Sequence, residues 1–322
     1  MQYAILANQW FTTMVVSMTP DQAKASSYKL AILAQAVPDD LVVPREWLLQ
    51  QGFTDDNLTG YVRSGYLARV GRALYAKPQL ARAWSSVEGV NATGQIAANV
   101  QPWKLALASS LLTEPVPLAV AGYSALLVRN LTHFASSAPP RQVWVTGPKA
   151  LPRWMAQMDS VEWKLLSATK LFTLEWAPVD ALPLARLGAD ELTQTLQGSG
   201  FEAVGRDTDK AWVIASSPER ALLEWASLLE GEADWRHFYE VMEGMPSLRP
   251  KLVQAMLKAC RSVKAKRIFL WMGKRLDASW YRAVKRDMSG IDLGKGKRQL
   301  IPGGALDTEY QITVVREISD GV

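Results

Sequence analysis

The chain has 322 residues, of which 48% are hydrophobic and 21% are charged, and its formal net charge is +5. This length predicts two or three domains, and this composition is that of a globular protein rather than a disordered one. One cysteine and two histidines exclude an internal disulfide and leave no plausible zinc site. No apolar run reaches the roughly 18 residues that a membrane helix needs. We therefore expect a cytoplasmic protein without membrane contact, metal or cofactor.

Residues 1–18 form an N-terminal extension to which we assign no function. The first 17 residues are rich in apolar side chains but contain no Lys or Arg, so they lack the positively charged start of a secretory signal. The sequence Thr19-Pro20-Asp21, which favours the start of a helix, follows Met18.

Residues 19–80 are predicted to fold as a winged helix-turn-helix. Leu30, Leu33 and Ala34 have the spacing of a buried helical stripe. Pro44 suits the first turn of a second helix, where its missing N–H would have no partner in any case.

The third helix of this module begins after Thr54, whose hydroxyl can cap it, and Gly65 can close it in a left-handed turn. Its core face should carry Leu58, Tyr61 and Val62. Two short alternating runs at 66–70 and 73–76 then predict a hairpin with Gly71 and Arg72 at its tip, as in a wing.

Such a module commonly places its third helix in the major groove of DNA. The side chains that we expect to contact DNA, first from the helix and then from the wing, are Asn57, Thr59, Arg63, Arg69, Arg72 and Lys77. Asn and Arg can read bases, whereas the wing residues would hold phosphates. Asp55 and Asp56 oppose this interpretation, because carboxylates favour the helix dipole but repel phosphate. A winged helix that docks proteins is the alternative.

Residues 81–100 resemble a linker, and residues 101–322 are predicted to form a larger mixed α/β domain. The fold class is therefore α/β (α+β), with a winged helix-turn-helix followed by this domain. Helical patterns occupy 103–112, the segment after the turn at 120–123, 218–224, 235–242 and 251–271. Strand patterns occupy 142–147, 161–166, 211–215 and 310–314.

Positive charge is concentrated in the basic segment, residues 251–298, which holds 14 Lys or Arg against 3 Asp or Glu. Such a concentration attracts polyanions. We therefore expect a polyanion or acidic-partner surface formed by Lys264, Lys266, Arg267, Lys274 and Arg275. The apolar residues 268–271 between these charges should be core.

Two further motifs leave alternatives open. Glu219 and Arg220 begin a helix, where they form either a cap with an internal ion pair or a partner surface. Glu162 and Lys164 have the Glu-x-Lys spacing of metal-dependent nucleases, but residues 115–158 contain no carboxylate that could complete a magnesium site.

No Gly-x-Ser-x-Gly motif of a serine hydrolase is present. A regulator that senses a small ligand through the larger domain is the remaining alternative.

Five motifs in this order resemble the AbiEi family of antitoxins from type IV toxin–antitoxin, or abortive-infection, systems. They are VRSGYLARVGRALY at 62–75, VAGYSAL at 120–126, VWVTG at 143–147, SPERALLE at 217–224 and ACRSVKAKRIFLW at 259–271. The resemblance spans about residues 25 to 318. It implies a phage-defence protein without enzymatic activity, whose winged helix binds inverted repeats in its own promoter and represses its operon. It also implies that the larger domain counteracts a nucleotidyltransferase-like toxin encoded next door and supports DNA contact.

Overall fold

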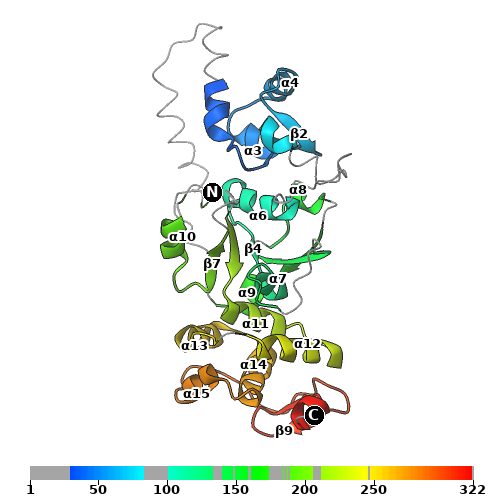
Figure 1. The fold of residues 1–322 in the computed structure, drawn as a ribbon, viewed down its shortest axis with the longest axis vertical. Coiled ribbons are helices and arrows are strands. Elements are labelled where there is room, and N and C mark those ends of the chain that lie inside the picture. Colours follow the sequence, from blue (N-terminus) through cyan, green and yellow to red (C-terminus); the bar gives the residue numbers. More distant parts are fainter. Residues whose placement is uncertain are drawn as a thin grey trace.

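The computed structural model places helical and sheet layers along one long axis, with a small winged-helix unit at one end (Figure 1). It describes residues 30–82, 101–132, 140–147, 149–158, 161–173, 184, 187, 189–205, 212–245 and 247–320. The N-terminal extension and residues 83–100 of the linker lie outside the described residues. Within the described part, no helix is long and apolar enough to cross a membrane.

The winged-helix unit combines the three predicted helices and the predicted hairpin with a third strand at 43–44, which was not predicted. Its elements are the helix at 30–36, β1 (Val43–Pro44), α3 (Arg45–Gln50), α4 (Asp55–Arg63), β2 (Ala68–Gly71) and β3 (Leu74–Ala76), followed by a helical turn at 78–82. The strand order is β1-β3-β2. The tip of the wing is Arg72 and Ala73, and Ala73 has a φ of 57°.

The boundaries of α4 follow from its local sequence. The Thr54 hydroxyl accepts a hydrogen bond from the backbone N–H of Asn57, and the Asn57 side chain accepts one from the backbone N–H of Thr54, which completes a capping box. Gly65 then turns the chain with a φ of 74°. Both predictions are confirmed.

Two details of this unit correct the sequence interpretation. Val62 is 37% exposed, whereas Leu58 and Tyr61 are buried, because the core touches only one edge of this short helix. Pro44 precedes α3 instead of opening it, and it pairs with Leu74 in the edge strand β1, where a missing N–H is tolerated.

Helix α6 (Pro102–Thr113) lies between the winged helix and the rest of the molecule (Figure 1). Ala108 and Leu112 pack into the core of the winged helix, while Leu107 packs into the main core. The backbone N–H of Val42 also donates to the Ser109 hydroxyl at 3.0 Å. This helix is largely apolar because its residues pack into three hydrophobic cores.

A five-stranded mixed sheet forms the middle layer. Its strand order is β6 (Glu162–Leu166), β5 (Gln142–Thr146), β4 (Ala119–Val120), β8 (Val213–Ser216) and β7 (Phe201–Val204). The pairs β5–β6 and β4–β8 are parallel, and the pairs β4–β5 and β7–β8 are antiparallel. The predicted strands at 142–147, 161–166 and 211–215 are confirmed, whereas β4 and β7 were not predicted.

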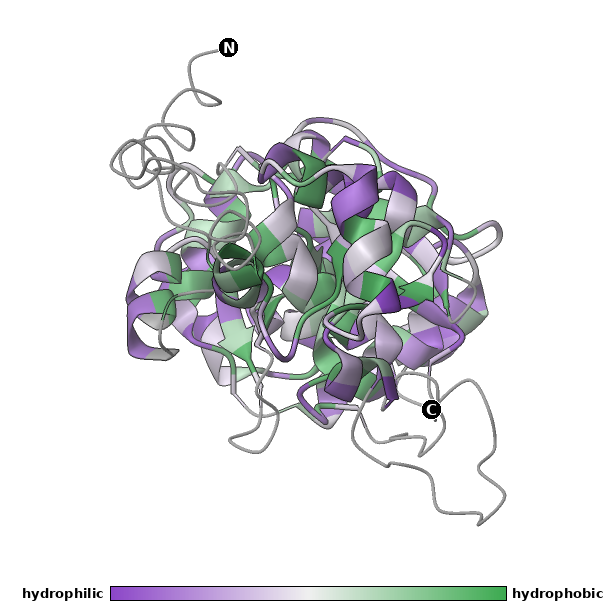
Figure 2. Ribbon diagram, turned by 90° about the horizontal axis from the view of Figure 1, so that it is seen from above, coloured by the Kyte–Doolittle hydropathy of each residue, from purple (hydrophilic) through white to green (hydrophobic). Residues whose placement is uncertain are grey.

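Helices cover the sheet and continue beyond it. Helix α10 (Ala189–Leu196) packs with α6 against β7 and β8, and α7 (Gly122–Leu127) packs with α11 (Pro218–Ala226) in the main core. The short helices α8 (Arg153–Ala156) and α9 (Ala168–Leu171) flank β6 in sequence. Seen along the long axis, hydrophobic segments gather toward the interior and hydrophilic ones toward the outside (Figure 2).

The far end of the molecule is mostly helical. It contains α12 (Glu232–Glu243), α13 (Pro250–Ala259), α14 (Val263–Arg275), α15 (Ser279–Lys285), the hairpin of β9 (Ala305–Asp307) and β10 (Ile312–Val314), and α16 (Arg316–Asp320). The apolar run 268–271 is buried in α14, as predicted. This end lies opposite the winged helix (Figure 1).

Candidate nucleic-acid interface

The outer face of α4 carries Thr59 and Arg63, both exposed. The Arg63 guanidinium makes no hydrogen bond or ion pair within the described residues. Arg63 lies one helical turn after Thr59, so the two side chains project from the same side of the helix. In Figure 1, α4 is at the outer end of the molecule.

The wing adds two further guanidinium groups to the winged-helix unit. Arg72 is exposed at the hairpin tip and has no ion pair among the residues that the structure describes. Arg69 donates to the Tyr75 hydroxyl at 3.3 Å, and its guanidinium lies 5.7 Å from the centre of the Tyr75 ring. The tyrosine therefore orients Arg69, while Arg72 is held only by the turn.

The remaining two candidates from the sequence have partners inside the winged helix. Asn57 serves in the capping box of α4. The Lys77 ammonium forms a 2.8 Å ion pair with Asp39 and donates to the Ala34 carbonyl at 3.1 Å. These contacts tie Lys77 to the end of the first helix.

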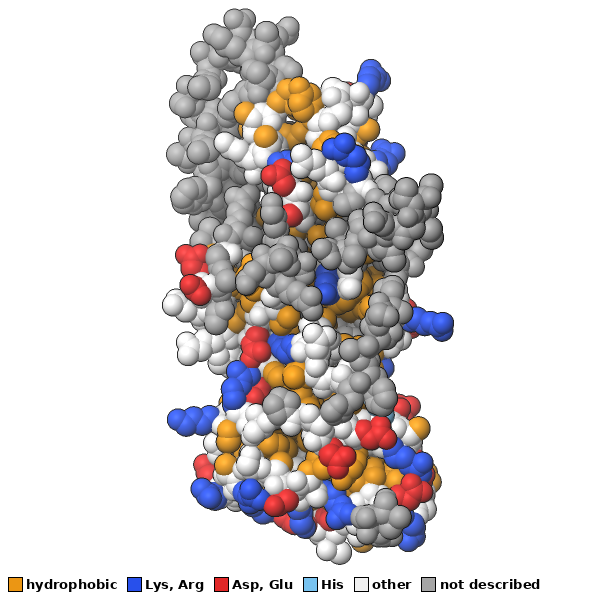
Figure 3. All heavy atoms as spheres, in the orientation of Figure 1, with side chains coloured by type: hydrophobic (Ala, Val, Ile, Leu, Met, Phe, Trp, Pro, Cys, Tyr) orange, Lys and Arg blue, Asp and Glu red, His pale blue; other side chains and the backbone are white. Residues whose placement is uncertain are grey.

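Asp55 and Asp56 are the two carboxylates that would repel DNA phosphates from α4. The structure pairs one of them with a cation that the sequence did not predict. Asp55 accepts two hydrogen bonds from Arg45, at 2.7 Å from Nε and 2.5 Å from Nη2. These bonds lower the pKa of the Asp55 carboxyl, and its charge is compensated by the guanidinium. Only Asp56 remains as a carboxylate without a described ion pair at the start of the helix. Figure 3 shows blue cationic side chains projecting at this end of the molecule.

The cluster expected in the basic segment is not a continuous surface. Lys266 and Arg267 are each only 3% exposed, so their expected place on a surface is wrong. Charge density along a sequence does not reveal which helical face is buried. The Arg267 guanidinium instead donates to the carbonyls of Leu293 and Gly296, both at 2.7 Å, and of Gln311 at 3.2 Å.

The other three members of that cluster also have internal partners. The Lys264 ammonium donates to the Leu229 carbonyl at 2.6 Å, and burial lowers its pKa. Lys274 is exposed but forms a 2.5 Å ion pair with Glu309, and Arg275 donates to the Ile318 carbonyl at 2.6 Å.

One group of exposed cations in this segment lies in the loop that Arg267 holds. Lys295, Lys297 and Arg298 are all exposed there, and their side chains form no ion pair with any residue that the structure describes. Gly294 and Gly296 have φ angles of 64° and 76°, which let the backbone fold back onto Arg267. We call Asp292 to Arg298 the basic loop. The glycine-rich pattern Gly-Lys-Gly-Lys predicts a loop here from the sequence alone.

The Ser-Pro-Glu-Arg motif is part of the core. Glu219 and Arg220 are each 1% exposed, so a partner surface formed by them is excluded. Arg249 donates to Glu219 from Nε at 2.9 Å and from Nη2 at 2.8 Å, and also contacts Glu202. Arg220 forms a 2.8 Å ion pair with Glu224 one turn later. The internal ion-pair interpretation is therefore the correct one, with two pairs instead of one.

The features that suggested an enzyme have other surroundings. Glu162 is exposed and accepts a hydrogen bond from Gln142, while the Lys164 ammonium lies 4.2 Å from the centre of the Trp144 ring. Among the described residues, no group of three His, Cys, Asp or Glu side chains could hold a metal. Burial raises the pKa of the Cys260 thiol to about 11, which disfavours a thiolate nucleophile.

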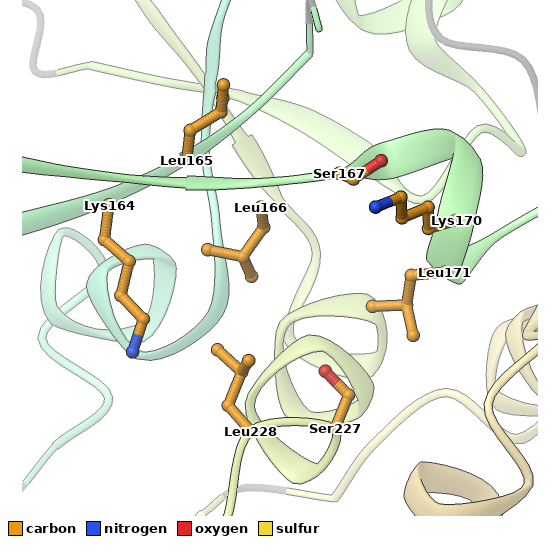
Figure 4. A pocket seen from close by; sticks show the side chains of 8 residues that line it. All are labelled: Lys164, Leu165, Leu166, Ser167, Lys170, Leu171, Ser227 and Leu228. Atoms are coloured by element: carbon orange, nitrogen blue, oxygen red, sulfur yellow. The ribbon is translucent and has the colours of Figure 1, made fainter. Parts of the chain in front are cut away.

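A cleft of about 270 Å³ opens beside the end of β6 (Figure 4). Its lining residues are Lys164, Leu165, Leu166, Ser167, Lys170, Leu171, Ser227 and Leu228. Half of these are leucines, and Ser227 already donates its hydroxyl to the Glu224 carbonyl. No carboxylate or histidine lines the cleft, and its titratable side chains are Lys164 and Lys170.

The comparisons with known proteins agree along most of the chain. A family model described as a transcriptional regulator, AbiEi antitoxin of a type IV toxin–antitoxin system, matches residues 140–315. The model of the corresponding N-terminal domain matches residues 26–136. No curated protein matches the chain. The crystal structure of the RV2827C protein from Mycobacterium tuberculosis is 14% identical, covers 91% of this chain and 93% of its own, and has a TM-score of 0.43.

Proposed function

The chain belongs to the AbiEi antitoxin family of transcriptional regulators from type IV toxin–antitoxin systems, and we propose that it binds inverted repeats in its own promoter through α4 and the wing and so represses its operon. The observation that carries this proposal is the position of Thr59, Arg63 and Arg72. All three are exposed at one end of the molecule, and neither arginine forms an ion pair within the described residues.

The expected docking follows from the geometry of the module. Helix α4 enters the major groove, where Arg63 reads guanine and Thr59 contacts a neighbouring base edge. Arg72 lies against a phosphate and fixes the register of the helix without reading sequence. Arg69, oriented by Tyr75, supports the same backbone contact.

Binding of purified variants to the upstream DNA duplex tests this proposal. Arg63→Ala should cost about 1–3 kcal/mol on that duplex and relax the base preference, because it removes a base contact. Arg72→Ala should weaken binding to the upstream and a scrambled duplex alike and reduce the salt slope by about one. Arg286→Ala, which removes an exposed arginine at the end of α15, at the end of the molecule opposite the winged helix, is the matched control. Unchanged affinity of both winged-helix variants at low and high salt contradicts the proposal.

We also propose that the larger domain counteracts a nucleotidyltransferase-like toxin encoded beside this chain, and that the protein is not itself an enzyme. The basic loop supports this second role, because its three cations have no described acidic partner and its backbone is held in place by Arg267. A fixed loop of this kind binds an acidic surface or a polyanion with little loss of conformational entropy.

Co-expression with the neighbouring toxin gene tests the second role. The wild-type chain should restore growth, and the triple variant Lys295→Ala, Lys297→Ala, Arg298→Ala should lose most of that protection while staying folded, since these side chains are exposed. Arg63→Ala should protect as well as the wild type, because its site is at the opposite end. Full protection by the triple variant would remove the basic loop from the neutralisation surface.

A further inference from the structure

Gly60 lies in the interior of α4, on its outer face, and the fold gives no reason for a glycine there. A Cβ atom built at Gly60 would meet no heavy atom within 4 Å, and its φ is not in the left-handed region. Glycine is among the least favourable residues in a helix interior and costs about fivefold in the folding equilibrium relative to alanine. The residue is therefore unfavourable for the isolated molecule.

Other helical glycines of the described residues show what a structural reason looks like. A Cβ at Gly273, inside α14, would lie 2.3 Å from the Trp280 ring. A Cβ at Gly122, the first residue of α7, would lie 2.5 Å from the Trp144 ring, and its φ is 49°. Packing or backbone conformation explains both of these glycines. At Gly60 neither does, and the missing side chain leaves the backbone of α4 open to close approach by an external surface.

The side chains around Gly60 indicate which kind of surface that is. Asp56 lies one turn before it and Arg63 about one turn after it on the exposed face. Asp56 makes no hydrogen bond or ion pair with the described residues. A carboxylate beside a phosphate is repelled, but a carboxylate at a base edge can accept a hydrogen bond from the N4 amino group of cytosine. Arg63 can bind guanine and Asp56 can bind cytosine, so the two side chains together fit a site that contains G·C base pairs.

We propose that α4 makes its closest approach to the duplex at Gly60, with its backbone against base edges, so that Asp56 accepts a hydrogen bond from a cytosine amino group. This inference rests on the proposed DNA binding and adds two specificity-determining positions to it. The Ser64 hydroxyl donates to the Gly60 carbonyl at 2.6 Å, which keeps that carbonyl paired where the helix ends.

Gly60→Ala separates this proposal from a purely structural account, because stability and affinity should move in opposite directions. The variant should unfold at a temperature higher by roughly 2–4 °C, since alanine favours the helix and meets no neighbour. It should bind the upstream duplex at least about tenfold more weakly, because the new methyl group holds the helix away from the bases. Gly231→Ala, at a second open glycine outside the winged helix, should leave affinity unchanged.

Asp56→Asn tests the base contact. It should weaken binding to the upstream duplex severalfold, because the hydrogen bond from the cytosine amino group is lost. It should strengthen binding to a scrambled duplex, because a negative charge is removed from the side that faces the DNA. Equal strengthening on both duplexes would show that Asp56 is only a repulsive charge and overturn its assignment. Gly60→Ala with wild-type affinity would overturn the close approach. If the wild-type chain itself fails to bind the upstream duplex, the proposed DNA binding fails, and this inference fails with it.

Discussion

Glu219 and Arg220 are neighbours in sequence but belong to two different buried ion pairs. The Arg220 guanidinium lies between the rings of Phe172 and Phe201, 4.1 Å from each ring centre, and pairs with Glu224. Glu224 also accepts hydrogen bonds from the Gly122 N–H and the Ser216 hydroxyl, at 2.8 and 3.0 Å. These contacts fasten α11 to α7 and β8. The motif thus has a structural explanation without any partner.

Glu219 depends on Arg249 for its charge, and this dependence predicts how stability responds to acid. Burial disfavours the ionised carboxyl, but the hydrogen bonds from Arg249 outweigh burial, so the pKa of Glu219 is lowered from 4.5. A lowered folded-state pKa contributes stability above the unfolded value and loses it as the pH falls through the folded value. The wild-type chain should therefore lose free energy of unfolding below about pH 4.5.

Arg249→Met should weaken or reverse the acid loss of stability. At neutral pH the variant should be less stable, because it leaves the Glu219 carboxylate buried without its guanidinium. Acidification should then relieve that charge, so the acid loss of stability shrinks or reverses. Denaturant unfolding at several pH values measures this, with Arg236→Met, in an exposed pair with Glu232, as the control. An acid response equal to that of the wild type would refute the assignment.

At the level of elements, short sequence patterns predicted the structure correctly wherever contacts between neighbouring residues determine it. The caps of α4, the wing and the start of α11 depend on hydroxyl caps, glycine turns and a proline at the first helical position, all within a few residues. For the same reason, Thr59, Arg63 and Arg72 could be placed on the exposed side of the module before its structure was known.

Other elements depend on contacts between residues distant in sequence, and these could not be predicted. Strand β4 has only two residues and gains its place by pairing with β5 and β8 on either side. Lys266 and Arg267 are buried because α14 packs against α11, and the carbonyls of the basic loop need Arg267 as a donor. A sequence count of charges contains no information about either partner. The Arg45 contact that compensates Asp55 escaped prediction for the same reason.

The whole molecule places two proposed activities at opposite ends, with α6 between them (Figure 1). Leu111 of this helix packs with α10 and β8, whereas its neighbour Leu112 packs into the winged helix. Residues 102–113 therefore belong physically to both units, although the sequence interpretation divides the chain near residue 101. Truncation within this helix would therefore damage both units.

Leu112→Ala tests whether α6 couples the two units. Removing this buried side chain should cost about 2–5 kcal/mol, because it leaves a cavity in the winged-helix core. If α6 is a shared element, hydrogen exchange should accelerate in β3 and also in β8, and Leu111→Ala should accelerate the same two strands from the other side. Leu306→Ala, which truncates an exposed side chain of β9, should change neither strand. Faster exchange confined to the winged helix in Leu112→Ala, with β8 unchanged, would show that the two units unfold independently and that α6 does not link them.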